Sequence, residues 1–146
     1  MALIYFYDTT DLDKQQLSAE LQHTDHTWEC VDEQISIDNL NPDTEVISVF
    51  VSSTVTAEII EKLPRLRLIA CRSTGYNNID FAAAKARDIV IVNVPSYGEK
   101  TVAEYTFALL LNLTRRIQIA STHINTEDQP LMMGMDLNQK TIGVIG

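Results

Sequence analysis

The sequence predicts an α/β fold with a parallel, flavodoxin-like sheet, and two observations carry this prediction. Short apolar runs rich in β-branched residues alternate with helical segments along the chain, which is typical of βαβ units. Two loops, at 73–75 and 95–98, each follow such a run and precede a helix-start signal. If neighbouring parallel strands carry these loops, both open at the carboxyl edge of one sheet, where open α/β sheets bind ligands.

The first half of the chain begins with a strand and a helix. Leu3 to Tyr7 is apolar and aromatic and is closed by turn-prone residues, which predicts a buried strand. Leucines on one side of the segment 11–21 predict a helix that is capped at or near Asp11. Further along we expect a marginal strand at 28–31, a loop or single turn at 35–41 and a strand at 46–51.

The next segments continue the alternation of helix and strand. Ala57 to Leu63 is a short predicted helix ended by Pro64, since proline disfavours helical geometry in the residue before it. Asp80 is a natural N-cap for the alanine-rich helix that follows it. Leu66 to Cys71 and Ile89 to Val94 are the strands on either side of this helix.

The longest predicted helix runs from Thr101 to Ile117. Thr101 and Glu104 have the spacing of a capping box. Almost all of its side chains before Arg115 are apolar, and a helix that is apolar all round is buried on all sides. One small sheet covers only one side, so we expect a second domain or a second chain to cover the other.

The last segment is predicted to lead into another strand. Residues 121–138 lose helical periodicity and indicate a linker, and residues 140–146, KTIGVIG, have the composition of a strand. A β-branched strand that ends in glycine is how a dinucleotide-binding unit begins. Gly146 is then a candidate for the first glycine of a truncated cofactor-binding motif.

Composition limits the classes of partner. The net charge is −9, with 20 acidic against 11 basic residues and no basic run, which argues against nucleic acid or an anionic membrane. Cys30 and Cys71 lie in apolar runs at a spacing that matches no metal or redox motif, so we interpret them as free thiols in a reducing compartment. No signal peptide or membrane-length apolar stretch is present. We expect a cytoplasmic protein with a small-molecule or protein partner.

Residues 66–146 carry a specific combination of motifs. The run S-x-G-x-x-N-I-D is followed by N-V-P, then by V-A-E at the start of a long apolar helix that ends in Arg-Arg, then by K-T-I-G-V-I-G. This order resembles the D-isomer-specific 2-hydroxyacid dehydrogenase family, which includes D-lactate dehydrogenase. The resemblance implies a substrate domain at 1–99, an interdomain helix at 100–119, and a linker with the first strand of a truncated NAD-binding (Rossmann) domain at 120–146.

The resemblance also implies a substrate site. Thr74 and Gly75 match the loop whose backbone N–H groups bind the substrate carboxylate, and Tyr97 matches a tyrosine that lactate-type members present to the pocket. Read from the residues alone, Gly75 permits a turn and Tyr97 is a half-exposed loop aromatic. Thr101 lies near the nicotinamide by analogy, although capping already explains it. Arg72 is either a steering charge or a solvated arginine at a strand end.

The family's catalytic arginine, glutamate and histidine match no position of this sequence and are expected beyond Gly146. The resemblance therefore implies the N-terminal part of an oxidoreductase that transfers a hydride between NAD and a D-2-hydroxyacid or its 2-keto partner, of the D-lactate and pyruvate type. We expect this chain alone to be inactive, to bind NAD poorly and to self-associate, and the parent to be a homodimer. The alternative is a non-enzymatic α/β binding or regulatory module, as in the corepressor branch of the family.

Overall fold

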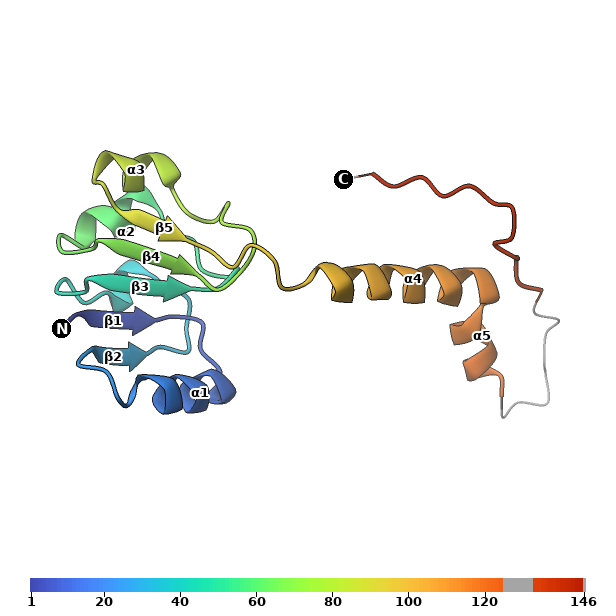
Figure 1. Cartoon of the computed structure of the whole chain (residues 1–146), viewed down its shortest axis with the longest axis horizontal. Coiled ribbons are helices and arrows are strands. Elements are labelled where there is room, and N and C mark those ends of the chain that lie inside the picture. Colours follow the sequence, from blue (N-terminus) through green and yellow to red (C-terminus); the bar gives the residue numbers. More distant parts are fainter. Residues whose placement is uncertain (125–132, 146) are drawn as a thin grey trace. The chain divides into compact units, whose positions relative to one another are not determined.

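The computed structural model describes residues 1–124 and 133–145 (Figure 1). The chain divides into two compact units, Met1–Tyr97 and Gly98–Gly146. The first unit contains the whole sheet, and the second contains the longest helix. Each unit is described by itself below.

The first unit is built on a five-stranded sheet in which every pair of neighbouring strands is parallel. The strand order is β2-β1-β3-β4-β5, which is the flavodoxin-like order and confirms the predicted fold class. The strands are β1 (Leu3–Phe6), β2 (Thr27–Cys30), β3 (Val46–Val49), β4 (Leu68–Cys71) and β5 (Val90–Val92). All five lie within one or two residues of the predicted segments.

Four helical segments connect these strands: α1 (Asp11–Leu21), the 3₁₀ helix η1 (Ile37–Asn39), α2 (Ala57–Lys62) and α3 (Phe81–Ala86). Side chains cap three of them. Asp80 caps α3 by accepting from the Ala83 N–H, as predicted, and Thr56 caps α2. Helix α1 is capped by Thr10, which forms a reciprocal capping box with Asp13.

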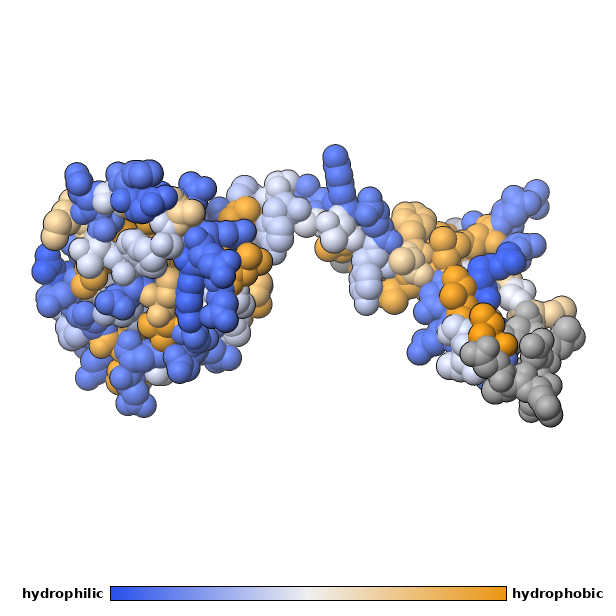
Figure 2. Space-filling view, turned by 90° about the horizontal axis from the view of Figure 1, so that it is seen from below, coloured by the Kyte–Doolittle hydropathy of each residue, from blue (hydrophilic) through white to orange (hydrophobic). Residues whose placement is uncertain are grey.

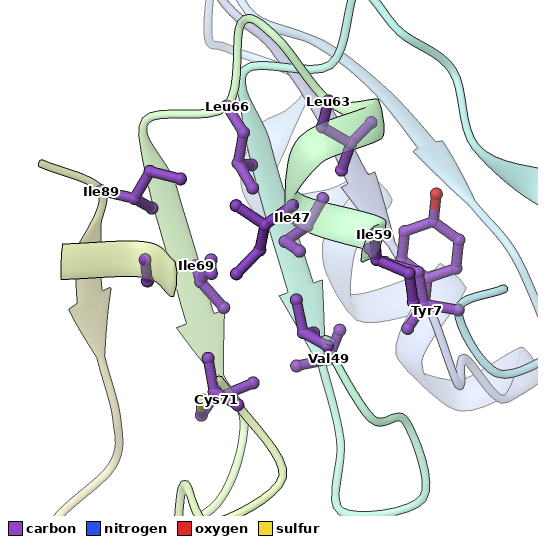
Figure 3. Close-up of a cluster of buried hydrophobic side chains, with 14 residues drawn as sticks. Tyr7, Ile47, Val49, Ile59, Leu63, Leu66, Ile69, Cys71 and Ile89 are labelled. Carbon is purple, nitrogen blue, oxygen red and sulfur yellow. The ribbon is translucent and has the colours of Figure 1, made fainter. Parts of the chain in front are cut away.

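The hydrophobic core lies on one face of the sheet (Figure 3). Alternate residues of the central strands, Ile47 and Ile69 among them, point to this face and have no exposed surface. Leu63, at the end of α2, packs into the same cluster. The opposite face is less covered, since Val90 is 54% exposed and a hollow of about 520 Å³ is lined by Ile4 and other side chains of this face.

The second unit contains α4 (Glu99–Arg115) and α5 (Ile117–Thr122). Helix α4 begins two residues before the predicted start. Its N-cap is Gly98, without a side-chain hydrogen bond, so the capping box predicted for Thr101 and Glu104 is wrong. Thr101 is the third residue of α4. A capping side chain must stand before the first turn to accept from its unpaired N–H groups, so Thr101 cannot act as the N-cap. Arg116 adopts the left-handed conformation, with φ of 53°, and separates the two helices.

Helix α4 is apolar and largely exposed. Val102, Tyr105, Leu109 and Leu113 recur at helical spacing and are 50–78% exposed. Only Thr114 of this helix is buried. Apolar residues gather over this unit in Figure 2. No helix in the described part of the chain is long and apolar enough to cross a membrane.

The segment after α5 differs from the prediction. Ser121 and Thr122 belong to α5 rather than to a linker. Residues 133–145 contain no strand, so the strand predicted at 140–146 is wrong for its described part. A strand requires a hydrogen-bonded neighbour, and no described residue pairs with 140–145 in a ladder. Gly146, the candidate cofactor-binding glycine, lies outside the described residues.

Candidate substrate-binding edge

The two predicted loops lie side by side at the carboxyl edge of the sheet. Residues 72–76 follow β4 and residues 93–97 follow β5, and these strands are neighbours. The Val94 N–H donates to the Ser73 carbonyl at 3.0 Å, which extends the pairing of the two strands beyond their ends. The prediction that both loops open at one edge is confirmed.

All three carbonyl oxygens of the turn 73–75 accept hydrogen bonds from the protein, and we call them inward in this sense. The Ser73 carbonyl accepts from the Val94 N–H, and the Thr74 carbonyl accepts from Asn93 Nδ2 at 2.7 Å. The Gly75 carbonyl accepts from the buried Ser73 hydroxyl at 2.7 Å. Carbonyl oxygens repel an anion, so their use in these hydrogen bonds leaves fewer free oxygens to oppose an anion at this turn.

The N–H groups of the same turn are exposed and free. Thr74 and Gly75 are both exposed, and neither backbone N–H donates to a hydrogen bond within residues 1–124 and 133–145. Successive free N–H groups in a turn form an anion-binding concavity. The Thr74 hydroxyl donates to the Val94 carbonyl at 3.0 Å and fixes the turn against the neighbouring loop.

Gly75 is not required by the backbone conformation of the turn. Its φ lies outside the left-handed region, and a Cβ built on it meets no atom within 4 Å. Glycine is therefore unnecessary for the turn itself, contrary to the interpretation based on the residue alone. The absent side chain leaves open space beside Gly75, into which a ligand can approach the backbone closely.

Two other predicted residues lie near the end of the first unit or beyond it. Tyr97 follows the β5 loop and is 64% exposed. Thr101 is exposed in the first turn of α4 and belongs to the second unit. Tyr97 remains a predicted pocket residue, and Thr101 remains a predicted cofactor neighbour.

Asp8 organises the same edge and was missed by sequence reasoning. It follows β1 with φ of 56°, a conformation that aspartate tolerates better than most residues. Its carboxylate accepts from the Phe50 N–H at 3.0 Å and from the Ser52 hydroxyl at 2.8 Å. The loop after β3 is thereby tied to the end of β1. The signal that could have found this role is an aspartate two residues after the end of a strand.

Asn78 ties the loops after β3 and β4 together. Its amide group donates to the Phe50 carbonyl at 3.1 Å and to the Ser53 carbonyl at 2.6 Å. Phe50, held at both its N–H and its carbonyl, is 39% exposed at the same edge as the turn 73–75.

Arg72 is not a solvated arginine at a strand end. It is half-buried, and its guanidinium donates to four acceptors. Nη1 donates to the carbonyl and hydroxyl of Ser48 at 3.1 and 3.2 Å, and Nη2 donates to the carbonyls of Tyr7 and Asp8 at 2.7 and 3.0 Å. The expectation of a free strand-end side chain failed because these carbonyls belong to strands distant in sequence.

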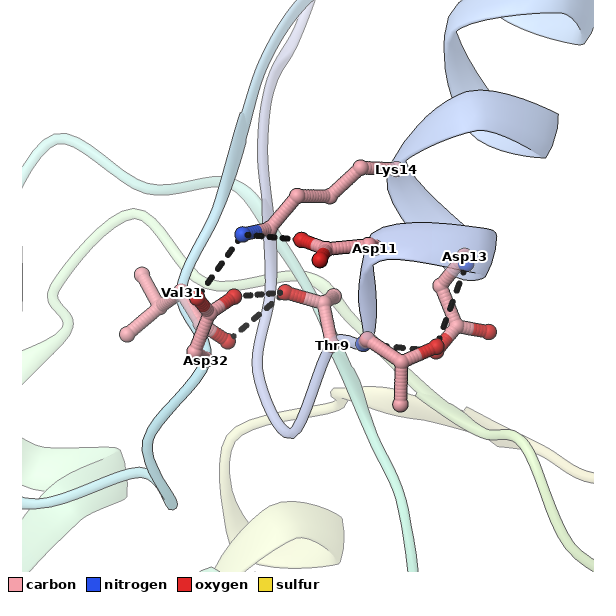
Figure 4. A network of polar contacts seen from close by, with 7 residues as sticks. Thr9, Asp11, Asp13, Lys14, Val31 and Asp32 are labelled. Carbon is pink, nitrogen blue, oxygen red and sulfur yellow. Dashed lines mark hydrogen bonds and ion pairs between the residues drawn. The ribbon is translucent and has the colours of Figure 1, made fainter.

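A second polar network closes the edge beside β2 (Figure 4). The Thr9 hydroxyl donates to the Val31 carbonyl and to Asp32, each at 3.0 Å. The Lys14 ammonium lies 2.7 Å from Asp32, which raises the pKa of Lys14, while the hydrogen bonds from Lys14 and Thr9 lower the pKa of Asp32. These groups bond to one another, so this part of the edge is structural.

Within the described residues, no histidine and no activated cysteine lies at this edge. His23 and His26 lie between α1 and β2, and His123 follows α5. Burial raises the pKa of both the Cys30 and the Cys71 thiol, so neither is an activated nucleophile. The arrangement of this edge is suited to binding and orienting an anion rather than to moving a proton.

Comparison with known proteins identifies the family. Residues 4–139 match the sequence model of the D-isomer specific 2-hydroxyacid dehydrogenase catalytic domain. The chain belongs to this family. The resemblance noted in the sequence is therefore confirmed.

The curated relatives of this chain are longer than the chain itself. A 2-hydroxyacid dehydrogenase homolog of Zymomonas mobilis is 32% identical over 149 aligned residues, which cover 98% of this chain and 45% of the relative. An aromatic 2-oxoacid reductase of Clostridium sporogenes is 38% identical over 104 residues, covering 68% of this chain and 31% of that protein. The chain thus spans less than half the length of these relatives.

Solved structures of family members share the fold. The D-lactate dehydrogenase of Aquifex aeolicus, determined with NAD and lactic acid, is 27% identical and superposes with a TM-score of 0.78. The match covers 92% of this chain and 41% of that enzyme.

Proposed function

We propose that this chain supplies the substrate-binding part of an oxidoreductase that transfers a hydride between NAD(H) and a D-2-hydroxyacid and its 2-keto partner, of the D-lactate and pyruvate type. The observation that carries the proposal is the turn 73–75, with its free N–H pair and its inward carbonyls. Family membership supports the reaction type. We also propose a cytoplasmic location, on the basis of composition.

The role of the turn is to bind and orient the substrate carboxylate. The N–H groups of Thr74 and Gly75 would donate to its two oxygens, in the way that backbone nests hold anions. The exposed aromatic side chains of Phe50 and Tyr97 belong to neighbouring loops of the same edge and would contact the rest of the substrate. NAD supplies and accepts the hydride in this reaction.

The described residues do not fit an NAD site by themselves. A dinucleotide-binding unit requires a glycine-rich loop directly after a strand, and Gly143 lies in a segment without a strand. We therefore propose that the chain alone neither binds NAD tightly nor catalyses. The proposed organisation is a substrate domain at 1–99, a connecting helix at 100–119, and a segment at 120–146 that leads into the cofactor domain.

A titration with pyruvate tests the proposed carboxylate site. The uniformly ¹⁵N-labelled chain is titrated with sodium pyruvate, with sodium chloride as an ionic-strength control and methyl pyruvate as an uncharged control. We expect the Thr74 and Gly75 amide resonances to move with pyruvate alone. Resonances that stay in place, or that move equally with chloride, would refute carboxylate binding at this turn.

We further propose that a second copy covers the exposed stripe of α4, in agreement with the expected homodimer. Val102, Tyr105, Leu109 and Leu113 form an apolar stripe on one side of a helix, and such stripes pair between helices. Light scattering at micromolar concentration is expected to show a mass above 16.4 kDa for the chain and a monomer for the variant with Leu109→Glu and Leu113→Glu. A monomeric wild-type chain would contradict this proposal.

A further inference from the structure

Arg72 connects three neighbouring strands at the edge where the turn 73–75 lies. It follows β4 directly, its guanidinium reaches Ser48 of β3, and it then reaches the carbonyls of Tyr7 and Asp8 at the end of β1. Strands β1, β3 and β4 are adjacent in the sheet. The side chain therefore fixes the three strand ends relative to one another.

The bonds of this guanidinium are made to uncharged groups. Its four acceptors are three backbone carbonyls and one hydroxyl. No carboxylate within the described residues forms an ion pair with Arg72. The planar guanidinium fixes the direction of each of its hydrogen bonds. Because Arg72 is half-buried and donates to carbonyls of several strands, it orients the strand ends.

Two connections lead from this guanidinium to the ligand-facing loops. Arg72 precedes Ser73, the buried residue whose hydroxyl holds the Gly75 carbonyl inward. It also holds the carbonyl of Asp8, whose carboxylate in turn binds the Phe50 N–H. Displacement of the guanidinium would loosen the turn 73–75 and the Phe50 loop together.

We propose that Arg72 is a positioning residue for substrate binding: its guanidinium locks the ends of β1, β3 and β4, and so holds the N–H pair of the turn 73–75 in register with the Phe50 loop. The inference rests on the carboxylate-binding role proposed for that turn. The Arg72 guanidinium acts through the direction of its hydrogen bonds and not through its charge.

The decisive variant is Arg72→Lys, which keeps the charge but lacks the fork. We expect hydrogen exchange at the Phe50 and Val94 amides to accelerate about tenfold, because these N–H groups bond to the Asp8 carboxylate and to the Ser73 carbonyl. We expect pyruvate affinity, measured from the Thr74 and Gly75 resonances, to fall by about fivefold or more. Unchanged exchange at both amides would overturn the inference.

Arg87→Lys is the matched control. The Arg87 guanidinium also binds backbone carbonyls, those of Ile60, Leu63 and Pro64, but it lies at the amino end of the strands. This variant should lower the thermal midpoint and leave exchange at Phe50 and Val94 unchanged. If the two variants accelerate exchange at these amides equally, Arg72 has only a general stabilising role and the inference fails.

A measurement on the wild-type chain does not depend on how the variants fold. Four hydrogen bonds hinder rotation of the Arg72 guanidinium, so its Nη protons should give separate NMR resonances at 25 °C. In exposed arginines the group rotates freely, and the Nη protons give one averaged resonance. Averaged Arg72 resonances would overturn the inference. Failure of the proposed function is distinct, because it appears as wild-type Thr74 and Gly75 resonances that do not respond to pyruvate.

Discussion

Replacing Gly75 with alanine is expected to separate the stability of the fold from binding at the turn. The new Cβ would meet no protein atom within 4 Å, and the φ of Gly75 lies outside the left-handed region. Alanine restricts the unfolded chain, so the substitution should stabilise the first unit by about 0.4–1 kcal/mol. For a unit of this size, that corresponds to a rise in Tm of about 2–8 °C.

The same methyl group should weaken binding. It would occupy open space beside residue 75, at the turn where the substrate carboxylate is proposed to bind. An extra methyl group in a filled site costs about 1–3 kcal/mol. This corresponds to a loss of affinity of about 5- to 150-fold. Stability and affinity should therefore change in opposite directions.

Thermal unfolding by circular dichroism and titration with pyruvate measure the two effects. Gly98→Ala is the control, because its Cβ also meets no atom within 4 Å and its φ of −109° suits alanine. It should leave pyruvate affinity unchanged. A Gly75→Ala chain that binds pyruvate as tightly as the wild type, or that is clearly less stable, would refute the reasoning about the turn.

Three further predictions concern the first unit. Ile69→Ala should lower the free energy of unfolding in urea by about 2–5 kcal/mol, because Ile69 has no exposed surface, whereas Ile69→Val should cost about 0.5–1.5 kcal/mol. Burial and the nearby Tyr5 raise the pKa of Tyr7 to about 12 from 10.0. The contribution of Tyr7 to stability is therefore fully present below pH 10 and is lost as pH rises from 10 towards 12. Denaturation curves of Tyr7→Phe across this range should lack that loss. Hydrogen bonds from Thr10 lower the pKa of Asp13 below 3.8, so the stabilisation is present above 3.8 and is lost as pH falls; the advantage of the wild type over Thr10→Ala in thermal unfolding should shrink in acid.

The fold could be predicted from the sequence because its signals are local. The β-branched runs, the Asp80 cap and the Pro64 stop each act within a few residues, and the five strands predicted before residue 97 are all present. The parallel sheet followed from the alternation of strands and helices, since parallel strands need crossovers that helices supply. The flavodoxin-like order was expected as the usual small form of such a sheet.

The errors arise where local residue patterns do not determine the structure. The strand expected at 140–145 has the right composition, but a ladder depends on a partner that composition does not reveal. At the start of α4, Thr101 and Glu104 have capping-box spacing, but the helix extends back to Gly98 and both residues lie inside it. Helix α5 begins after a left-handed arginine, a conformation that no local signal marks.

The candidate site was predicted in part. Thr74 and Gly75 were identified through the resemblance, and the structure adds that their carbonyls are all held inward. Asp8 and Arg72 were missed in their structural roles because their partners lie about 40 and 64 residues away along the chain. Such pairings require the sheet order, which brings the ends of β1, β3 and β4 together.

The inward carbonyls of the turn also determine the thermodynamics of recognition. Because the turn 73–75 is held by hydrogen bonds from Val94, Asn93 and Ser73 before any ligand arrives, binding has little backbone to order. A preorganised site loses less conformational entropy on association. Anion binding here should therefore proceed as a single rapid step without a slow rearrangement, and calorimetry should show a small entropic penalty.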